Sequence, residues 1–107
     1  MAPVTSVPPL SESQRQQARA AATQVRRHRA AAKARLRTGD LHLSAFLDLA
    51  ENDDVLAHIK VVDLLRSLPR VGDKRAADTM ERLDIAPSRR IRGLGRHQLA
   101  ALREEFR

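Results

Sequence analysis

Two short turn signals, 23 residues apart, most constrain what this 107-residue chain can fold into. They are LPRVG at residues 68–72, the first hairpin, and IRGLG at residues 91–95, the second hairpin. Each ends in Gly where a helical stretch begins, and Gly lets a ligand approach the backbone closely. Because the first turn of a helix has N–H groups without helical partners, such a hairpin favours phosphate capture. Arg89, Arg90 and Arg92 flank the second hairpin, so the pair indicates nucleic acid.

Basic charge is concentrated in two blocks of the chain, which has a formal net charge of +7. Residues 11–37 hold eight basic side chains and one acidic side chain. Residues 38–65 hold one basic and six acidic side chains, and residues 66–107 hold eleven basic and six acidic ones. Most of the cations are Arg, whose forked guanidinium group suits phosphate. We expect the two basic blocks to meet the partner and the acidic block to face away.

Composition excludes several other classes of protein. The chain has no Cys, Trp or Tyr, so we expect no disulfide, no thiolate metal site and no stacking platform for single strands. The four His residues lack metal-ligand spacing, and we expect neither a metal nor a cofactor. No apolar run approaches the ~20 residues of a membrane span, and no secretory signal opens the chain. We therefore expect a cytoplasmic protein with no membrane partner.

Apolar spacing predicts an all-α fold with three parts. Residues 1–10 contain three Pro and no charge, which favours a disordered N-terminal arm. A capping-box spacing from Ser11 to Gln14 and a stop at Gly39 predict a long basic N-terminal helix over residues 11–38. We expect its half from Val25 onward to pack on the body and the earlier half to project into solvent. Residues 40–107 predict a compact bundle of short helices.

The core of this bundle is predicted from large apolar residues at helical spacing. It comprises Leu43, Phe46, Leu47, Leu64, Leu65, Leu68, Val71, Met80, Leu83, Leu94, Leu99, Leu102 and Phe106. Ala76 and Ala77 are also expected to face inward. Ala77 and Ala100 hold equivalent places after the two hairpins, where a small residue would favour close helix packing.

The hairpins resemble the helix-hairpin-helix signature of DNA-backbone binders, with Arg70 standing where that signature has Gly. Residues 60–106 also resemble the helix-two-turns-helix module of the ribosomal protein S13 type. The whole layout is similar to the actinobacterial integration host factor family from about Gln14 to Phe106. It combines an Arg/Ala-rich first helix with ENDDVL, KVVDLLRSLPRVGDKRA and IAPSRRIRGLG.

This resemblance implies a nucleoid-associated architectural protein rather than an enzyme. It would bind double-stranded DNA with little sequence preference, through phosphates and the minor groove, and would bend DNA or constrain its topology. The S13-type module also serves in ribosomal proteins, so an RNA-binding or ribosome-associated protein is the alternative. No heptad seam of large residues indicates a coiled coil, and we expect a monomer.

The candidate DNA-binding residues are the two hairpins and the basic side chains beside them. They are Leu68, Pro69, Arg70, Val71, Gly72, Lys74, Arg75, Arg89, Arg90, Arg92, Gly93, Leu94, Gly95 and Arg96. We expect the backbone amides of Val71, Gly72, Leu94 and Gly95 to meet phosphates. The second hairpin keeps both glycines of the pattern and is expected to be the stronger contact. A second candidate contact on the N-terminal helix comprises Arg26, Arg27, Arg29 and Lys33.

Lys74 raises a catalytic alternative. It lies two places after the hairpin Gly, the position of the Schiff-base Lys in endonuclease III-like DNA glycosylases. A chain of this length leaves little room for the base-flipping pocket that such chemistry needs. We therefore expect Lys74 to contact phosphate.

Overall fold

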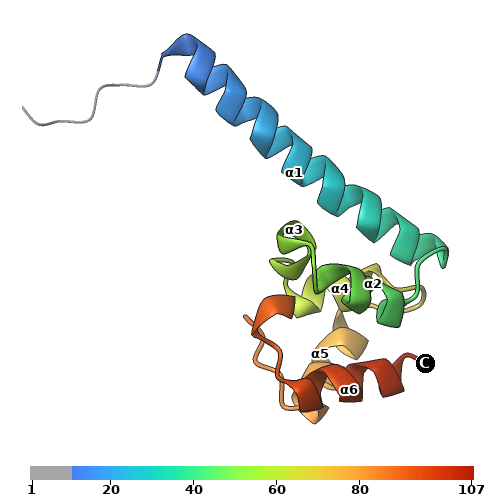
Figure 1. The fold of residues 1–107 in the computed structure, drawn as a ribbon. Helices are drawn as coiled ribbons and strands as arrows, with labels where there is room; N and C mark the ends of the chain where they lie inside the picture. The colour runs from blue at the N-terminus through green and yellow to red at the C-terminus, as the bar shows by residue number, and fades with distance from the viewer. Residues whose placement is uncertain (1–10) are drawn as a thin grey trace, which may run out of the picture.

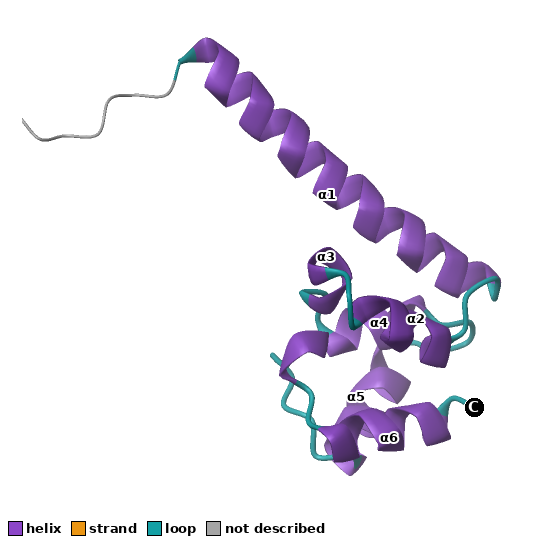
Figure 2. Cartoon of the chain, in the orientation of Figure 1, coloured by secondary structure: helices purple, strands orange, loops and turns teal. Residues whose placement is uncertain are grey.

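The computed structural model describes residues 11–107, and the arm expected at residues 1–10 lies outside them. Helices make up the regular structure of the described residues, which contain no strand, so the predicted all-α fold is confirmed (Figure 2). In chain order the elements are α1 (Glu12–Thr38), α2 (Leu43–Ala50), α3 (Asp54–Ala57), α4 (Val61–Ser67), α5 (Asp73–Arg82), the 3₁₀ helix η1 (Ile91–Gly93) and α6 (Arg96–Glu105). None of the described helices is long and apolar enough to cross a membrane.

Helix α1 begins and ends where local sequence signals predict. The Ser11 hydroxyl accepts a hydrogen bond from the Gln14 amide, and the Gln14 side chain accepts one from the Ser11 amide, at 3.1 and 2.9 Å. Gly39 ends the helix in the left-handed conformation at φ 82°, where Gly avoids the steric cost of a side chain. The helix has 27 residues and extends well beyond the body of the molecule (Figure 1).

The half of α1 nearest the body packs on α3 and α4, as predicted. Val25 is half-buried, and Ala32 and Leu36 are buried, whereas every side chain from residue 11 to residue 22 is exposed. A short hydrogen bond reinforces this packing, because His28 Nε2 lies 2.6 Å from Asp53 Oδ2. The other Asp53 oxygen accepts hydrogen bonds from the Val55 and Leu56 amides in the first turn of α3. Asp53 therefore caps α3 and ties it to α1.

The core lies between the end of α1 and the short helices. Phe46, Leu64, Leu65 and Leu102 are fully enclosed, as predicted, together with Leu36. Four residues expected in the core are only partly buried and pack against its edge: Leu68, Leu83, Leu99 and Phe106. Several buried residues were absent from the predicted core: Leu36, Leu41, Leu56, Ile59, Val61, Ile85 and Ile91.

The inward prediction is right for Ala76 and wrong for Ala77. Ala76 is fully buried, while Ala77 and its expected counterpart Ala100 are exposed. Ala76, Thr79 and Met80 lie on one face of α5 and are buried in the core. Ala77 follows Ala76 directly in the sequence and therefore lies on a different face, outside the core. The small residue that lets α5 pack closely is therefore Ala76.

A single antiparallel bridge between Lys60 and Arg90 fixes the segment before η1 to the start of α4. The Val61 amide donates to the Arg89 carbonyl at 2.9 Å, and the Ile91 amide donates to the Ile59 carbonyl at 3.0 Å. This pairing holds the arginines of the second hairpin against the body of the protein.

Candidate nucleic-acid interface

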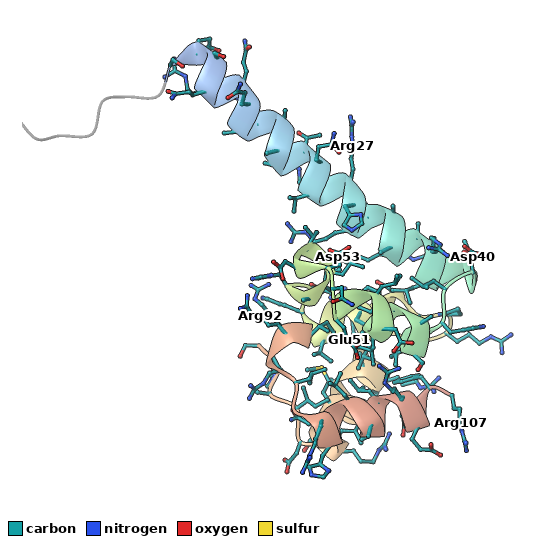
Figure 3. All side chains as sticks on the ribbon, viewed as in Figure 1. Arg27, Asp40, Glu51, Asp53, Arg92 and Arg107 are labelled. Atoms are coloured by element: carbon teal, nitrogen blue, oxygen red, sulfur yellow. The ribbon has the colours of Figure 1, made fainter. Side chains whose placement is uncertain are left out.

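The second hairpin lies beside an open hollow rich in arginine. The hollow is lined by His58, Ala86, Ser88, Arg89, Arg90, Arg92 and Gly93, with no carboxylate among these residues. Arg92 is exposed and lies at the edge of the body, and no hydrogen bond or ion pair engages its side chain within residues 11–107 (Figure 3). Five guanidinium donors are thus available to an incoming anion.

The other two arginines of this hollow also hold the backbone. Arg89 Nη1 donates to the Gly93 carbonyl at 3.1 Å, and Arg90 Nη1 donates to the His58 carbonyl at 2.6 Å. A Cβ at position 93 would lie 2.9 Å from Arg89 Cδ, so Gly93 makes room for this arrangement. Both guanidinium groups are exposed and retain further donors, which leaves them positioned to bind phosphate.

Three of the four hairpin amides expected to meet phosphates have acceptors within the protein. The amides of Val71 and Leu94 donate to the Leu68 and Ile91 carbonyls within their own turns, at 3.2 and 3.1 Å. The Gly95 amide donates to the Gln98 side chain at 3.0 Å. The Gly72 amide has no such partner among the described residues. The exposed guanidinium groups are therefore the main donors that the second hairpin offers to a ligand, whereas the first hairpin keeps the free Gly72 amide.

The first hairpin presents a strained Arg and an exposed Gly. Arg70 has φ 65°, a left-handed conformation that favours Gly and explains why the helix-hairpin-helix signature has Gly there. Pro69, Arg70 and Gly72 are exposed, Leu68 is half-buried, and Val71 is buried in the core. Lys74 is exposed in the first turn of α5, and the Arg75 guanidinium lies 5.5 Å from the centre of the Phe106 ring.

The structure divides the predicted DNA-binding residues between two places. The first hairpin borders the α1–α2 turn and the C-terminal residues, whereas the second borders His58 and the end of the α5–η1 loop. These two hollows share no lining residue. Figure 3 shows Arg92, from the second hairpin, and Arg107, beside the first hairpin, on opposite sides of the body. Arg96 follows the second hairpin and is exposed in the first turn of α6.

The candidate contact on α1 is also divided. Arg26 and Arg27 are exposed, and Arg27 points away from the body in Figure 3. Arg26 Nη2 donates to the Thr23 hydroxyl of the same helix at 3.1 Å. Arg29 and Lys33 are half-buried because they lie closer to the face that packs on α3 and α4. Arg26 and Arg27 are therefore the members of this set that a second ligand can reach freely.

A histidine and an arginine beside the first hairpin were not among the predicted site residues. His42, in the α1–α2 turn, and Arg107, at the C-terminal end, line the same hollow as Arg70. They are 28 and 37 residues away from Arg70 in the sequence. No local pattern could have joined them to the hairpin, because tertiary folding alone brings these segments together.

The short helices of this module and the turns between them place it in the helix-two-turns-helix class of domain. The sequence profile of the S13-like H2TH domain matches residues 36–106. This protein therefore belongs to the S13-like H2TH domain family, and the resemblance to the S13-type module is confirmed.

Its relatives include actinobacterial integration host factors, as the sequence resemblance implied. The integration host factor of Mycobacterium tuberculosis is 46% identical over 101 residues, which cover 94% of this chain and 96% of the relative. That of Streptomyces coelicolor is 45% identical over 101 residues and 94% of each chain. The solved structure of sIHF bound to an 8-bp palindromic DNA has a TM-score of 0.78 and 45% identity, covering 80% of this chain and 97% of that one.

Proposed function

We propose that this protein binds double-stranded DNA as a nucleoid-associated architectural protein, with the second hairpin as its principal contact. The observation that carries the proposal is the hollow lined by Arg89, Arg90 and Arg92, whose lining residues include no carboxylate. The names of the relatives and the DNA in the sIHF structure support the same partner. They favour DNA over the RNA-binding alternative.

The proposed contacts are made mainly to the backbone of the duplex. Guanidinium groups form charge-assisted, forked hydrogen bonds with phosphate oxygens. Such contacts fix the position of a protein on DNA and carry no direct sequence information, which accounts for little sequence preference. Arg92 is the side chain best placed to extend from the phosphates into the minor groove, since nothing in residues 11–107 holds it.

The proposed role is to shape DNA rather than to catalyse a reaction. Lys74, the residue of the catalytic alternative, is exposed on an open part of α5 with Gly72, Asp73 and Asp78. An extruded base needs an enclosed pocket, which this open position does not offer. The proposal includes a nucleoid location, bending or topological constraint of DNA, and the division into an arm, a long helix and a DNA-binding domain at residues 40–107.

The double variant Arg92→Ala/Arg96→Ala tests the principal contact. Neither side chain has a hydrogen bond or ion pair in residues 11–107, so the fold should be unaffected. We expect the affinity for a 20-bp duplex at 100 mM salt to fall about tenfold or more, and the salt slope by up to about 2. Arg15→Ala/Arg19→Ala, with the same charge loss at the far end of α1, is the control. An affinity equal to that of the control would refute the proposed contact.

The proposed effect of the protein on DNA topology needs a separate assay. A relaxed plasmid is incubated with the protein and a topoisomerase, and its linking number is then measured. We expect a protein-dependent change in linking number, which Arg92→Ala/Arg96→Ala reduces. An unchanged linking number, together with straight DNA in images of the complexes, would contradict the architectural role while leaving DNA binding itself standing.

A further inference from the structure

An apolar groove lies between α4, α5 and the loop that follows α5, and neither hairpin contributes to its lining. It has a volume of about 560 Å³. Its floor contains Met80 and Ile85, which are buried, and Val62, which is half-buried. Small exposed residues complete the apolar part of the lining: Ala77, Ala86 and Pro87. Such a groove on the surface is typical of a site that receives a ligand or a partner.

The rim of this groove carries two carboxylates, and no basic side chain is among its lining residues. Glu81, in the last turn of α5, and Asp84, just after that helix, are both exposed. No ion pair or hydrogen bond engages either carboxylate in residues 11–107. Two unpaired carboxylates beside an apolar floor repel the phosphates of DNA and favour an occupant that is both cationic and partly apolar.

The backbone holds Asp84 in place at the rim. Asp84 has a left-handed conformation, at φ 61°, and the Ile85 amide that follows it donates to the Met80 carbonyl at 2.8 Å. The Asp84 carbonyl accepts a hydrogen bond from Gln98 Nε2 of α6 at 2.9 Å. The rim is therefore fixed by both α5 and α6, and a partner would not have to order it on binding.

The exposed half of α1 is a segment with the chemistry that this groove favours. Helical spacing places three exposed alanines on the face of α1 that packs on the body further along: Ala18, Ala21 and Ala22 lie on the same side as Val25, Ala32 and Leu36. Every side chain from residue 11 to residue 22 is exposed, so this part of the face is uncovered in the single molecule. A helical segment without packing is only marginally stable in water.

Arginines lie along one edge of this alanine stripe. Arg15, Arg19 and Arg26 are exposed and are spaced four and seven residues apart, which places them on one side of the helix. Arg15 is paired with Glu12, and Arg26 donates to Thr23 of the same helix. No hydrogen bond or ion pair engages the Arg19 side chain in residues 11–107. Arg19 is therefore the cation of this edge that is most available to a carboxylate of another molecule.

We propose that the groove receives the exposed half of α1 from a second copy of this chain. The alanine stripe lies on the apolar floor, as amphipathic helices do in grooves, while Arg19 and the arginines of its edge pair with Glu81 and Asp84. Because α1 extends well beyond its own body, its exposed half can reach another molecule (Figure 1).

Each copy offers one helix and one groove, so the contact is head-to-tail and can repeat from copy to copy. Alanine methyl groups bury little apolar area and exposed ion pairs contribute little, so we expect weak association and a monomer in dilute solution.

A spin label tests the contact without DNA, so its failure leaves the proposed function untouched. The chain has no Cys, and Gln17→Cys therefore provides a single attachment site beside the alanine stripe. The labelled protein is mixed at millimolar concentration and low salt with isotope-labelled wild type, whose amide signals are recorded by NMR. We expect the strongest broadening at Ala77, Asp84 and Ile85. Broadening that is absent, uniform over the protein or strongest elsewhere would overturn the proposal.

Matched variants of the isotope-labelled protein connect the broadening with the rim. Glu81→Gln/Asp84→Asn should weaken the association about fivefold, since two exposed ion pairs are lost. Asn tolerates the left-handed backbone at position 84. Asp54→Asn/Asp78→Asn removes the same charge from exposed, unpaired carboxylates outside the groove and should change the association little. Equal losses in both variants would mean a general attraction of charges and would overturn the site.

An exchange of charges tests the orientation of the helix. Arg19→Glu in the spin-labelled protein should abolish most of the broadening in wild type, and Glu81→Arg in the isotope-labelled protein should restore it, because opposite charges then face each other again. Arg19→Glu leaves the Ser11 cap and the buried turns of α1 unchanged, so its helix content by circular dichroism should equal that of wild type. Broadening that survives Arg19→Glu, or that Glu81→Arg does not restore, would contradict the proposed pairing.

Discussion

Two non-glycine residues, Arg70 and Asp84, have left-handed backbone conformations among residues 11–107, at φ 65° and 61°. Such a conformation costs a residue with a side chain roughly 1–2 kcal/mol. Both Arg70→Gly and Asp84→Gly should relieve this cost, partly offset by the flexibility of Gly in the unfolded chain. We expect each to stabilise the protein by up to about 1 kcal/mol in urea denaturation.

The two variants should differ in binding. Arg70→Gly removes a cation from the first hairpin, whereas Asp84→Gly removes a carboxylate from a different hollow. Only Arg70→Gly should therefore weaken nucleic-acid binding. Equal loss of binding in both variants, or no gain of stability in either, would contradict this account of the strain.

The sequence alone showed that Arg70 stands where the helix-hairpin-helix signature has Gly, because this signature is a local motif. It did not allow the use of each amide to be predicted. The Leu94 amide donates to the Ile91 carbonyl, and the Gly95 amide donates to the Gln98 side chain. A hydrogen-bond acceptor is chosen by three-dimensional geometry, and a Gly-rich turn has the same sequence whether its amides are free or bonded.

Asp53 predicts a pH dependence of stability. Its hydrogen bond with His28 lowers the pKa of Asp53 in the folded protein. The hydrogen bond to the ionised Asp53 carboxylate therefore stabilises the fold above the unfolded pKa of about 3.9, and the contribution is lost as pH falls through the lower folded value. Asp53→Asn keeps an oxygen that can cap α3 and loses the charge. We expect wild type to exceed Asp53→Asn in unfolding free energy near pH 5.

Denaturation at pH values between about 5 and 2 provides the measurement, with the window set by the unfolded pKa. The difference between wild type and Asp53→Asn should shrink as the pH falls. Asp53→Ala, which also removes the cap, should lose about a further 1 kcal/mol at every pH. A pH-independent difference between wild type and Asp53→Asn would show that the pair with His28 adds no stability.

At the scale of elements, α1 consists of two halves with different sources of stability. The last turns bury Ala32 and Leu36, whereas residues 11–22 are exposed and depend on helix propensity and the Ser11 cap. Ala20→Gly/Ala21→Gly should therefore destabilise the exposed half by about 2 kcal/mol and leave the body intact. Hydrogen exchange should accelerate between residues 15 and 24, with an unchanged global denaturation midpoint.

Leu36→Ala is the contrasting variant. Leu36 is fully enclosed, so its truncation should lower the global unfolding free energy by about 2–5 kcal/mol. A comparable global loss for Ala20→Gly/Ala21→Gly would mean that the exposed half of α1 folds together with the body.

The ends of α1 were predictable because Ser11, Gln14 and Gly39 act locally. The prediction that Ala77 faces inward was wrong, because two neighbouring alanines in a sequence do not show which of them faces the core.

At the scale of the whole molecule, the sequence indicated two basic hairpins but contained no signal of how they lie relative to each other. The pairing of residues 59–61 with residues 89–91 sets the second hairpin against His58. The first hairpin instead meets the α1–α2 turn and the C-terminal residues. The two hydrogen bonds of this pairing join residues about 30 positions apart in the sequence, and such long-range bonds leave no periodic pattern that could be recognised. The separation of the two hairpins was therefore beyond prediction from local motifs.

The basic residues of α1 lie on two faces of the helix, and this division allows one further test of how the molecule holds DNA. Arg26 and Arg27 are exposed, while Arg29 and Lys33 are half-buried near the body. If α1 contacts a second duplex, Arg26→Gln/Arg27→Gln should reduce the capture of a fluorescent duplex by protein bound to an immobilised duplex. We expect a reduction of about tenfold, the scale of two lost phosphate contacts.

Arg29→Gln/Lys33→Gln is the matched control, because it removes the same charge from the same helix on the face turned toward α3 and α4. It should lower capture much less. Both proteins should bind a single duplex with nearly the affinity of wild type, since the second hairpin is unchanged. If both pairs of substitutions reduce capture equally, net charge rather than the exposed face of α1 governs the second contact. If neither does, α1 is not a DNA-binding surface, and capture depends on the hairpins alone.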